Sequence, residues 1–403
     1  MKINPHKVKA QERALKLARS NNNLLLKWAT GVGKTKATID IINRFKTKKK
    51  VLLVIAEVLH EDNWKEEFKK WKLKSNIKVT ITTYASLHKY KGKTFDYLIL
   101  DEAHHSGSDL KQHILDNIKA KNVVALSATL PNDILKGLIN IFGEFKVFEI
   151  TLQDAIDTEI LPEPKIYLIK KTLDNDKRTQ LVEICRGNEK YYKTIITDYP
   201  NRWTYLSNKI KYPNLKLKLM CTEREKYFHI NDNFEYWKRQ YNRFRSIKNK
   251  TIFLSRGNLR KRYIGSLKTE TAKKVISTLE DKRFICFCTD IKQAEELNSK
   301  YAIHSKKKNS DLLVEKFNKG KIDSIFAVGK LQEGQNLNNI EVGIIIQLDG
   351  VERGFVQKFG RSLRAEYPEQ FIIYIDETKD MDYLENINNL DSKYITTINE
   401  EDL

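Results

Sequence analysis

The stretch Trp28-Ala29-Thr30-Gly31-Val32-Gly33-Lys34-Thr35 decides the fold of the first part of the chain. It follows the apolar run 24–26 and precedes a segment, 36–45, whose apolar side chains fit a helix. A strand, a glycine-rich turn that ends in Gly-Lys-Thr and a helix form a phosphate-binding loop, in which backbone N–H groups close around the phosphates. The candidate nucleotide-binding residues are therefore Thr30, Gly31, Val32, Gly33, Lys34 and Thr35.

Two side chains of this loop have separate tasks. Lys34 can reach the β and γ oxygens of a nucleotide, and Thr35 can hold Mg²⁺. The full pattern has Gly at position 28, where this chain has Trp. A short Gly-x-Gly-Lys-Thr loop also arises by chance, so its interpretation depends on residues elsewhere in the chain.

The chain is strongly basic. Among its 403 residues, 73 are Lys or Arg and 52 are Asp or Glu, which gives a formal net charge of +21. This excess predicts a polyanionic partner, nucleic acid first, because neutralising phosphates releases counterions. The alternative is a generally basic surface with no such partner.

Cysteine usage and hydropathy exclude several protein classes. The four cysteines form no C-x-x-C pair, so neither a zinc ribbon nor a disulfide framework is indicated. Cys286 and Cys288 lie two apart on an expected strand and should face one core. No stretch is apolar enough to span a membrane, and the N-terminus lacks a signal-peptide core. We expect a cytoplasmic protein without a membrane partner.

Short apolar runs alternate with longer periodic segments in two parts of the chain. In the first part the runs are 51–56, 79–82, 97–100 and 123–126. In the second part they are 284–288, 324–328, 342–348 and 371–375. Such short runs between helices predict parallel sheets covered on both faces. The expected fold is two α/β domains in tandem, of which only the first carries a phosphate loop.

The segment between these two parts has a different texture, dense in Lys, Arg, Tyr and Trp. Four aromatic residues follow at steps of three and four and share one helix face: Phe234, Trp237, Tyr241 and Phe244. Arg239 and Arg243 fall on the opposite face. We favour a helical insertion with an aromatic core stripe and a solvated basic back. The alternative is a basic helical arm that contacts a nucleic-acid backbone or a strand junction.

This texture sets the expected domain boundaries. Residues 1–164 form the first α/β domain, with the phosphate loop. Residues 165–268 form the basic, aromatic-rich helical insertion, and residues 269–403 form the second α/β domain.

A pair of carboxylates follows the apolar run 97–100, in the sequence Asp101-Glu102-Ala103-His104. A carboxylate at the end of a buried strand, beside a phosphate loop, is well placed to hold Mg²⁺. We expect Asp101 to hold it through water and Glu102 to take a proton from the attacking water. No spaced ligand partners the adjacent histidines in a zinc site, and we interpret His104 as a coupling residue.

These motifs resemble those of superfamily 2 helicases and translocases, in the family's order. Gly31-Val32-Gly33-Lys34-Thr35, Asp101-Glu102-Ala103-His104 (a DEAH motif) and Ser127-Ala128-Thr129 look like motifs I, II and III. In the second α/β part, Phe284-Ile285-Cys286-Phe287-Cys288-Thr289 resembles motif IV and Glu333-Gly334-Gln335-Asn336-Leu337 resembles motif V. Gln357-Lys358-Phe359-Gly360-Arg361-Ser362-Leu363-Arg364 looks like motif VI.

The resemblance implies two RecA-like domains with a split active site. Gly334 and Asn336 would contribute to the nucleotide site from the second domain. Gln357 would orient water or phosphate, and Arg361 and Arg364 would reach the γ-phosphate when the domains close. In the first domain, Ser127 and Thr129 would sense the γ-phosphate and link it to the nucleic-acid groove.

Further details resemble Swi/Snf-like DNA translocases and phage recombination helicases that remodel branched DNA. The segments 51–56 and 63–71 resemble motif Ia and its helix, and 81–87 resembles motif Ib. The resemblance implies that Thr83, Tyr84 and Thr289 contact phosphates of one strand. Trp64 and Trp71 are either helix–core contacts or DNA contacts. In many relatives a Gln near the N-terminus reads adenine; Lys7 stands in its place here, and Gln11, one helical turn later, is a possible substitute.

The sequence thus predicts a monomeric, ATP- and Mg²⁺-dependent DNA helicase or translocase. The resemblance to phage helicases suggests a phage-encoded enzyme for replication, recombination or repair, which would act in the host cytoplasm. One alternative is an RNA helicase or RNA-remodelling ATPase. Another is the motor subunit of a restriction or defence complex. The third is a nucleic-acid-binding scaffold with a dead ATPase, against which the presence of Lys34, Asp101 and Glu102 argues.

Overall fold

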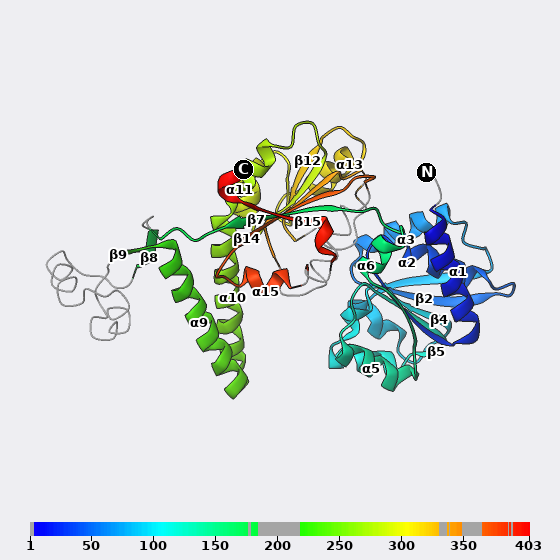
Figure 1. Cartoon of the computed structure of the whole chain (residues 1–403). Helices are drawn as coiled ribbons and strands as arrows, with labels where there is room; N and C mark the ends of the chain where they lie inside the picture. Colours follow the sequence, from blue (N-terminus) through cyan, green and yellow to red (C-terminus); the bar gives the residue numbers. More distant parts are fainter. Residues whose placement is uncertain are drawn as a thin grey trace. The chain divides into compact units, whose positions relative to one another are not determined.

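The structure is a computed structural model that describes residues 4–175, 179–183, 218–329, 337, 339–348, 365–385, 387 and 390–403 (Figure 1). The chain forms two compact units. One comprises Met1–Lys170, Thr269–Tyr374 and Lys379–Leu403, and the other comprises Lys171–Lys268 and Ile375–Thr378. The first unit contains two separate parallel β-sheets, and the second contains a helical hairpin.

The first sheet has six strands in the order β3-β2-β4-β5-β1-β6. All of its neighbouring strands pair in parallel. The strands are β1 (Asn23–Trp28), β2 (Lys49–Ile55), β3 (Ile77–Thr83), β4 (Thr94–Leu100), β5 (Lys119–Ser127) and β6 (Lys146–Ile150). Because the strands are parallel, their carboxyl ends lie at one edge of the sheet, and the phosphate loop and the carboxylate pair both follow strands at that edge.

Helices cover both faces of this sheet, as the short apolar runs predict. Leu24 and Leu26 of β1 belong to one apolar cluster and Leu25 to another, so successive side chains enter opposite cores. Buried residues of α1 (Pro5–Ser20), α2 (Lys34–Asn43) and α3 (Leu59–Lys70) join the first cluster. Buried residues of α4 (Asp109–Asp116) and α5 (Asn132–Phe142) join the second. The short elements of this part are η1 (Tyr84–Tyr90), η2 (Ala103–Ser106) and α6 (Leu152–Asp157).

The second sheet has seven strands in the order β11-β12-β10-β13-β14-β7-β15. They are β7 (Lys165–Lys171), β10 (Phe284–Phe287), β11 (Ala302–Ile303), β12 (Ser324–Ala327), β13 (Val342–Ile345), β14 (Glu369–Ile375) and β15 (Ile395–Asn399). Strand β7 pairs in parallel with β15, at the far end of the chain. The two parallel-sheet α/β domains expected from the sequence are therefore confirmed, and strand 165–171 belongs to the second sheet.

Helices also cover both faces of the second sheet. The helical elements are α11 (Thr269–Ser277), α12 (Ile291–Asn298), α13 (Ser310–Asn318), α15 (Asp380–Leu384), η4 (Ser392–Tyr394) and η5 (Glu400–Asp402). Side chains of α11 and α12 pack on one face with Cys286 and Cys288, and side chains of α13 and α15 pack on the other. Both cysteines are free and buried in the same core, as their spacing predicts.

The second unit contains a long helical hairpin of α9 (Glu223–Phe244) and α10 (Ile247–Leu267), which lie side by side in Figure 1. A two-stranded antiparallel sheet of β8 (Thr179–Glu183) and β9 (Lys218–Cys221) precedes it. Helix α9 starts with a capping box between Thr222 and Glu225. It ends at Arg245, whose left-handed backbone (φ +49°) turns the chain into α10.

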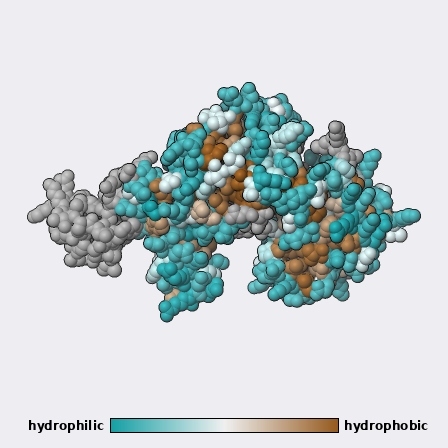
Figure 2. All heavy atoms as spheres, in the orientation of Figure 1, coloured by the Kyte–Doolittle hydropathy of each residue, from teal (hydrophilic) through white to brown (hydrophobic). Residues whose placement is uncertain are grey.

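The aromatic stripe of α9 partly packs on α10. The ring centroids of Phe234 and Tyr241 lie 5.2 Å and 5.9 Å from that of Phe253 in α10. Phe244, near the tip of the hairpin, is 57% exposed. Arg239 and Arg243 are both exposed, and the part of the hairpin visible in Figure 2 is mainly hydrophilic. The arrangement has an aromatic contact between the helices and a solvated basic surface.

Candidate nucleotide-binding site

The phosphate loop lies between β1, which ends at Trp28, and α2, which begins at Lys34. Gly31 and Gly33 have φ values of +93° and +105°, in the left-handed region that favours glycine. A Cβ atom on Gly33 would also lie only 2.7 Å from Nε2 of Gln11. Both the turn and the packing therefore require Gly33. The first N–H groups of an α-helix have no partner within the helix, so the start of α2 at Lys34 suits an anionic ligand.

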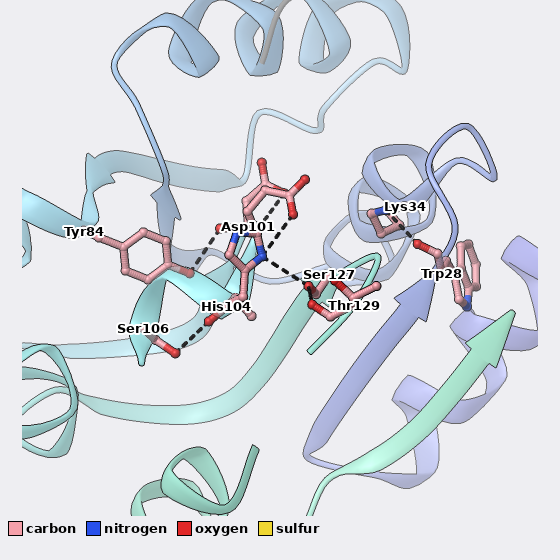
Figure 3. A network of polar contacts seen from close by, with 10 residues as sticks. Trp28, Lys34, Tyr84, Asp101, His104, Ser106, Ser127 and Thr129 are labelled. Atoms are coloured by element: carbon pink, nitrogen blue, oxygen red, sulfur yellow. Dashed lines mark hydrogen bonds and ion pairs between the residues drawn. The ribbon is translucent and has the colours of Figure 1, made fainter. Parts of the chain in front are cut away.

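Lys34 extends back along its own loop. Its Nζ donates a hydrogen bond to the carbonyl oxygen of Trp28, at 2.8 Å (Figure 3). Burial lowers the pKa of Lys34, while the charges of Glu102 and Asp101 act in the opposite direction. The two carboxylates thus lie near enough to the lysine to act on its charge. The ammonium group has three N–H donors, so Lys34 can bind a phosphate oxygen with a donor that the Trp28 carbonyl does not occupy.

Trp28 shows why the loop tolerates a residue other than Gly at its first position. Its side chain is fully buried, and its ring packs edge-on against Phe148 with a centroid distance of 5.3 Å. The side chain therefore belongs to the core, and only the backbone of Trp28 contributes to the loop.

Gln11 of α1 reaches the loop from outside. Its amide nitrogen lies where a side chain on Gly33 would begin. No atom of Lys7, which stands at the position where the resemblance leads us to expect Gln, lies within 4 Å of a Cβ placed on Gly33. The structure thus brings the possible substitute, Gln11, beside the nucleotide-binding residues.

Asp101 directly follows β4 and continues its pairing, because its N–H donates to the carbonyl of Val54 at 2.9 Å. Its two carboxylate oxygens each accept a hydrogen bond: Oδ2 from Nε1 of Trp64 at 2.7 Å, and Oδ1 from the N–H of Glu102 at 3.1 Å. The hydroxyl of Tyr84 donates to the Asp101 carbonyl at 3.1 Å (Figure 3). Both the carboxylate and the backbone of Asp101 are therefore fixed.

Trp64 is a site residue that sequence reasoning missed. Its position allowed only a choice between a core contact and a DNA contact, and the structure gives a core position with a hydrogen bond to Asp101. The two residues lie 37 positions apart. No local spacing could have indicated this contact.

A polar relay leads away from the carboxylates. Glu102 has a left-handed backbone (φ +48°), which turns the chain sharply after β4. Nδ1 of His104 lies 3.5 Å from Oε2 of Glu102 and 3.3 Å from Oγ of Ser127. Ser127 in turn donates to the carbonyl of Thr129 at 2.6 Å (Figure 3). The structure thus joins the residues predicted for coupling, His104, Ser127 and Thr129, to the carboxylate pair.

The donor set fits Mg²⁺. This ion typically takes one or two carboxylates, with nucleotide phosphates and waters completing its shell. Asp101 and Thr35 supply a carboxylate and a hydroxyl; Asp101 directly follows β4 and Thr35 lies in α2 after β1, and the carboxyl ends of both strands lie at one edge of the sheet. Within the described ranges, no group of three or more His, Cys, Asp and Glu side chains forms a metal cluster. A magnesium ion shared with a nucleotide does not need one.

The residues predicted to contact nucleic acid occupy different environments. The hydroxyl of Thr83 accepts from the N–H of Ser86 at 3.2 Å, where it caps η1. Tyr84 is 3% exposed, and little of its side chain can touch a nucleic acid. Thr289 is buried, and its N–H donates to Gln293 at 2.8 Å. Their contacts with nucleic acid stay predictions.

The candidate residues of the second half of the split site are Gly334, Asn336, Gln357, Arg361 and Arg364. All of them lie outside the described residues. In the part of the chain that the structure describes, no helix is both long and apolar enough to cross a membrane.

Two family models match the chain in sequence. Residues 1–132 match the model described as "Type III restriction enzyme, res subunit". Residues 267–366 match the model of the helicase conserved C-terminal domain. A search among curated proteins finds no match.

Solved structures share the fold at low identity. The Pyrococcus furiosus Hef helicase domain is 13% identical, with a TM-score of 0.52, and the match covers 94% of this chain and 97% of that one. S. cerevisiae Dbp5 bound to RNA and ADP BeF3 is 12% identical, with a TM-score of 0.56 and coverage of 100% and 95%. LlaBIII, an ATP-dependent Type ISP restriction-modification enzyme bound to DNA, is 14% identical, with a TM-score of 0.55; the match covers 99% of this chain and 31% of that one.

The sheet topology and these neighbours establish two RecA-like domains. Helicase domains in general belong to nucleic-acid-stimulated ATPases, which bind ATP and generally Mg²⁺. The chain thus carries two regions that match helicase-type family models on a fold of two RecA-like domains.

Proposed function

We propose that this chain is an ATP-dependent DNA helicase or translocase that couples hydrolysis to movement on, or remodelling of, duplex or branched DNA. One observation carries the proposal. Lys34, the carboxylates of Asp101 and Glu102, and the relay through His104 to Ser127 follow strands at a single edge of one parallel sheet.

At this edge, each residue has a separate task. The loop N–H groups and Lys34 bind the β- and γ-phosphates, and Lys34 does so with an N–H donor that the Trp28 carbonyl does not occupy. Asp101 and Thr35 hold Mg²⁺, which when bound neutralises charge on the phosphates. Glu102 accepts a proton from the attacking water, as in a DEAH-type motif.

The relay links this chemistry to the nucleic acid. His104 contacts both the proposed base, Glu102, and Ser127, which is the last residue of the neighbouring strand β5. A change at the γ-phosphate that moves Glu102 would therefore reach Ser127 and Thr129 through side chains already in contact. His104, Ser127 and Thr129 are the proposed coupling path.

The second RecA-like domain completes the site in this proposal. Gly334 and Asn336 contact the nucleotide, Gln357 orients water or phosphate, and Arg361 and Arg364 stabilise the transferring phosphate. Their support is the motif resemblance and the match of residues 267–366 to a helicase C-terminal domain. The proposed domains are 1–164, 165–268 and 269–403.

The hairpin is the proposed nucleic-acid arm. Arg239 and Arg243 are exposed on α9, and Lys and Arg outnumber Asp and Glu along both helices. Exposed cations that neutralise phosphates bind without regard to sequence, which suits a motor that moves along its track. Thr83 and Thr289 are the proposed strand contacts within the α/β domains.

Two alternatives remain open. The match of residues 1–132 to the Type III restriction model, and the fold shared with LlaBIII, favour a motor of a restriction or defence complex. The fold shared with Dbp5, whose structure holds RNA, leaves an RNA helicase as the other alternative. A monomeric state, a cytoplasmic location, a phage origin, and a role in recombination or repair belong to the proposal.

The nucleotide preference is part of the same proposal. Gln11 lies beside the phosphate loop and carries an amide that could read adenine. If it does, Gln11→Ala should lower the preference for ATP over GTP, whereas Lys7→Ala should leave this preference unchanged. Equal effects of the two substitutions would argue against the role of Gln11.

The first experiment is ATP turnover of the purified chain, alone and with single-stranded DNA, duplex DNA, a four-way junction and RNA. Lys34→Ala serves as the control for contaminating ATPase. Stimulation by duplex or junction DNA is the expected result. Stimulation by RNA alone would refute the DNA assignment, and turnover that persists in Lys34→Ala would refute the assignment of the site.

A further inference from the structure

The metal-binding carboxylate proposed above has an unusual neighbour. Nε1 of Trp64 donates a hydrogen bond to Oδ2 of Asp101 at 2.7 Å, a short distance for N–H to oxygen. A hydrogen bond to an ionised carboxylate is stronger than one between neutral groups. The indole therefore orients the Asp101 carboxylate.

The position of Trp64 is itself well fixed. The residue lies in α3, is only 3% exposed, and packs against Phe68 one turn later, with ring centroids 5.5 Å apart. A large buried ring has few alternative rotamers in a close-packed core. Its N–H thus points at Asp101 because the packing of α3 holds it there.

A hydrogen bond from a different element fixes the backbone of Asp101. Tyr84, at the start of η1, donates its hydroxyl to the Asp101 carbonyl. With the backbone fixed in this way, the direction of the carboxylate depends on the N–H of Glu102 at Oδ1 and on the side-chain donor of Trp64 at Oδ2.

We propose that Trp64 is a positioning residue. Its indole N–H holds the Asp101 carboxylate in the direction in which it binds Mg²⁺. This inference rests on the proposed metal-binding role of Asp101. Residues that orient metal ligands in this way typically change metal affinity or activity by about 10- to 100-fold when they are removed.

The chain offers a matched control in Trp71. Its Nε1 also donates to a carboxylate, Oε2 of Glu67, at 2.6 Å. This pair lies on the surface, where Trp71 is 36% exposed. Trp64→Phe and Trp71→Phe therefore remove the same chemical group from similar bonds, of which only one involves Asp101.

The experiment measures binding of a fluorescent ATP analogue across a series of Mg²⁺ concentrations and in EDTA, without turnover. Trp64→Phe should need about 10-fold more Mg²⁺ for half-maximal binding than the wild type, while its affinity in EDTA stays the same. Trp71→Phe should match the wild type in both conditions. In the Asp101→Asn background, adding Trp64→Phe should change nothing further, because the two residues act through one bond.

Several results would overturn the proposal. Equal Mg²⁺ requirements in Trp64→Phe and Trp71→Phe would remove the positioning role. If Trp64→Phe loses as much nucleotide affinity in EDTA as it does with Mg²⁺, Trp64 has only a structural role. The same conclusion follows if Trp64→Phe has its full effect in the Asp101→Asn background. If the wild type itself shows no Mg²⁺-dependent binding, the proposed function fails at Asp101, which is a distinguishable outcome.

A measurement on folded protein covers the case in which Trp64→Phe does not fold. The chain contains 5 tryptophans, whose indole N–H groups can be followed in ¹⁵N-labelled wild type. Asp101→Asn should shift one indole signal that Glu67→Gln leaves in place. If Asp101→Asn moves no indole signal, the bond to Trp64 has no role in solution.

Discussion

The relay from the carboxylates to Ser127 allows a sharp test of coupling, because the site contains two buried serines that differ in one contact. Oγ of Ser127 donates to the carbonyl of Thr129 at 2.6 Å and lies 3.3 Å from His104. Oγ of Ser106 donates to the carbonyl of Ala103 at 2.7 Å. Both side chains are fully buried. Ser127→Ala and Ser106→Ala form a matched pair.

The expected magnitudes follow from these contacts. Each substitution removes one buried neutral hydrogen bond, which lowers the free energy of unfolding by about 0.5–1.5 kcal/mol. Only Ser127→Ala also removes the contact with His104. If that contact contributes a similar amount to coupling, nucleic-acid stimulation of turnover falls by about 2- to 13-fold, since 1.36 kcal/mol is a factor of ten.

The assay compares ATP turnover with and without duplex DNA, and thermal unfolding of each variant. We expect Ser127→Ala to lose at least as much stability as Ser106→Ala, because it removes the contact with His104 as well, and we expect a lower stimulation ratio in Ser127→Ala alone. An unchanged ratio in Ser127→Ala would refute the relay. An equal fall in both variants would mean that stability, and not the His104 contact, controls the ratio.

Three further predictions concern the base, the lysine and the arm. Glu102→Gln should bind the ATP analogue normally but lose about 100- to 10,000-fold in turnover, which is the typical contribution of a general base. Normal turnover in this variant would refute the role of Glu102 as the base. Because burial lowers the pKa of Lys34 and phosphate binds its protonated form, nucleotide affinity should fall as the pH rises through that lowered pKa, and a titration from neutral to alkaline pH should show no such fall in Lys34→Ala. Charge reversal at Arg239 and Arg243 should weaken DNA binding and reduce its salt slope by about one for each lost phosphate contact, whereas an unchanged slope would assign the arm a structural role.

Local sequence patterns were enough to predict the two sheets and the phosphate loop. Residues 24–26 alternate between two cores, and the short apolar runs recur in two sets, so neighbouring residues alone specified strands that are buried on both faces. The loop required Gly31 and Gly33 for positive φ values, which glycine adopts at no steric cost. These features depend on residues close together in the chain, so they can be predicted from the order of the residues alone.

The distant side chains that contact the candidate site, in contrast, became evident from the folded chain. Trp64 reaches Asp101 across 37 positions, and Gln11 reaches Gly33 from α1. Local sequence spacing likewise did not predict that Tyr84 is buried or that β7 pairs with β15 at the end of the chain. Such contacts arise when helices pack on a sheet, because packing brings together residues whose chemistry carries no information about one another's position.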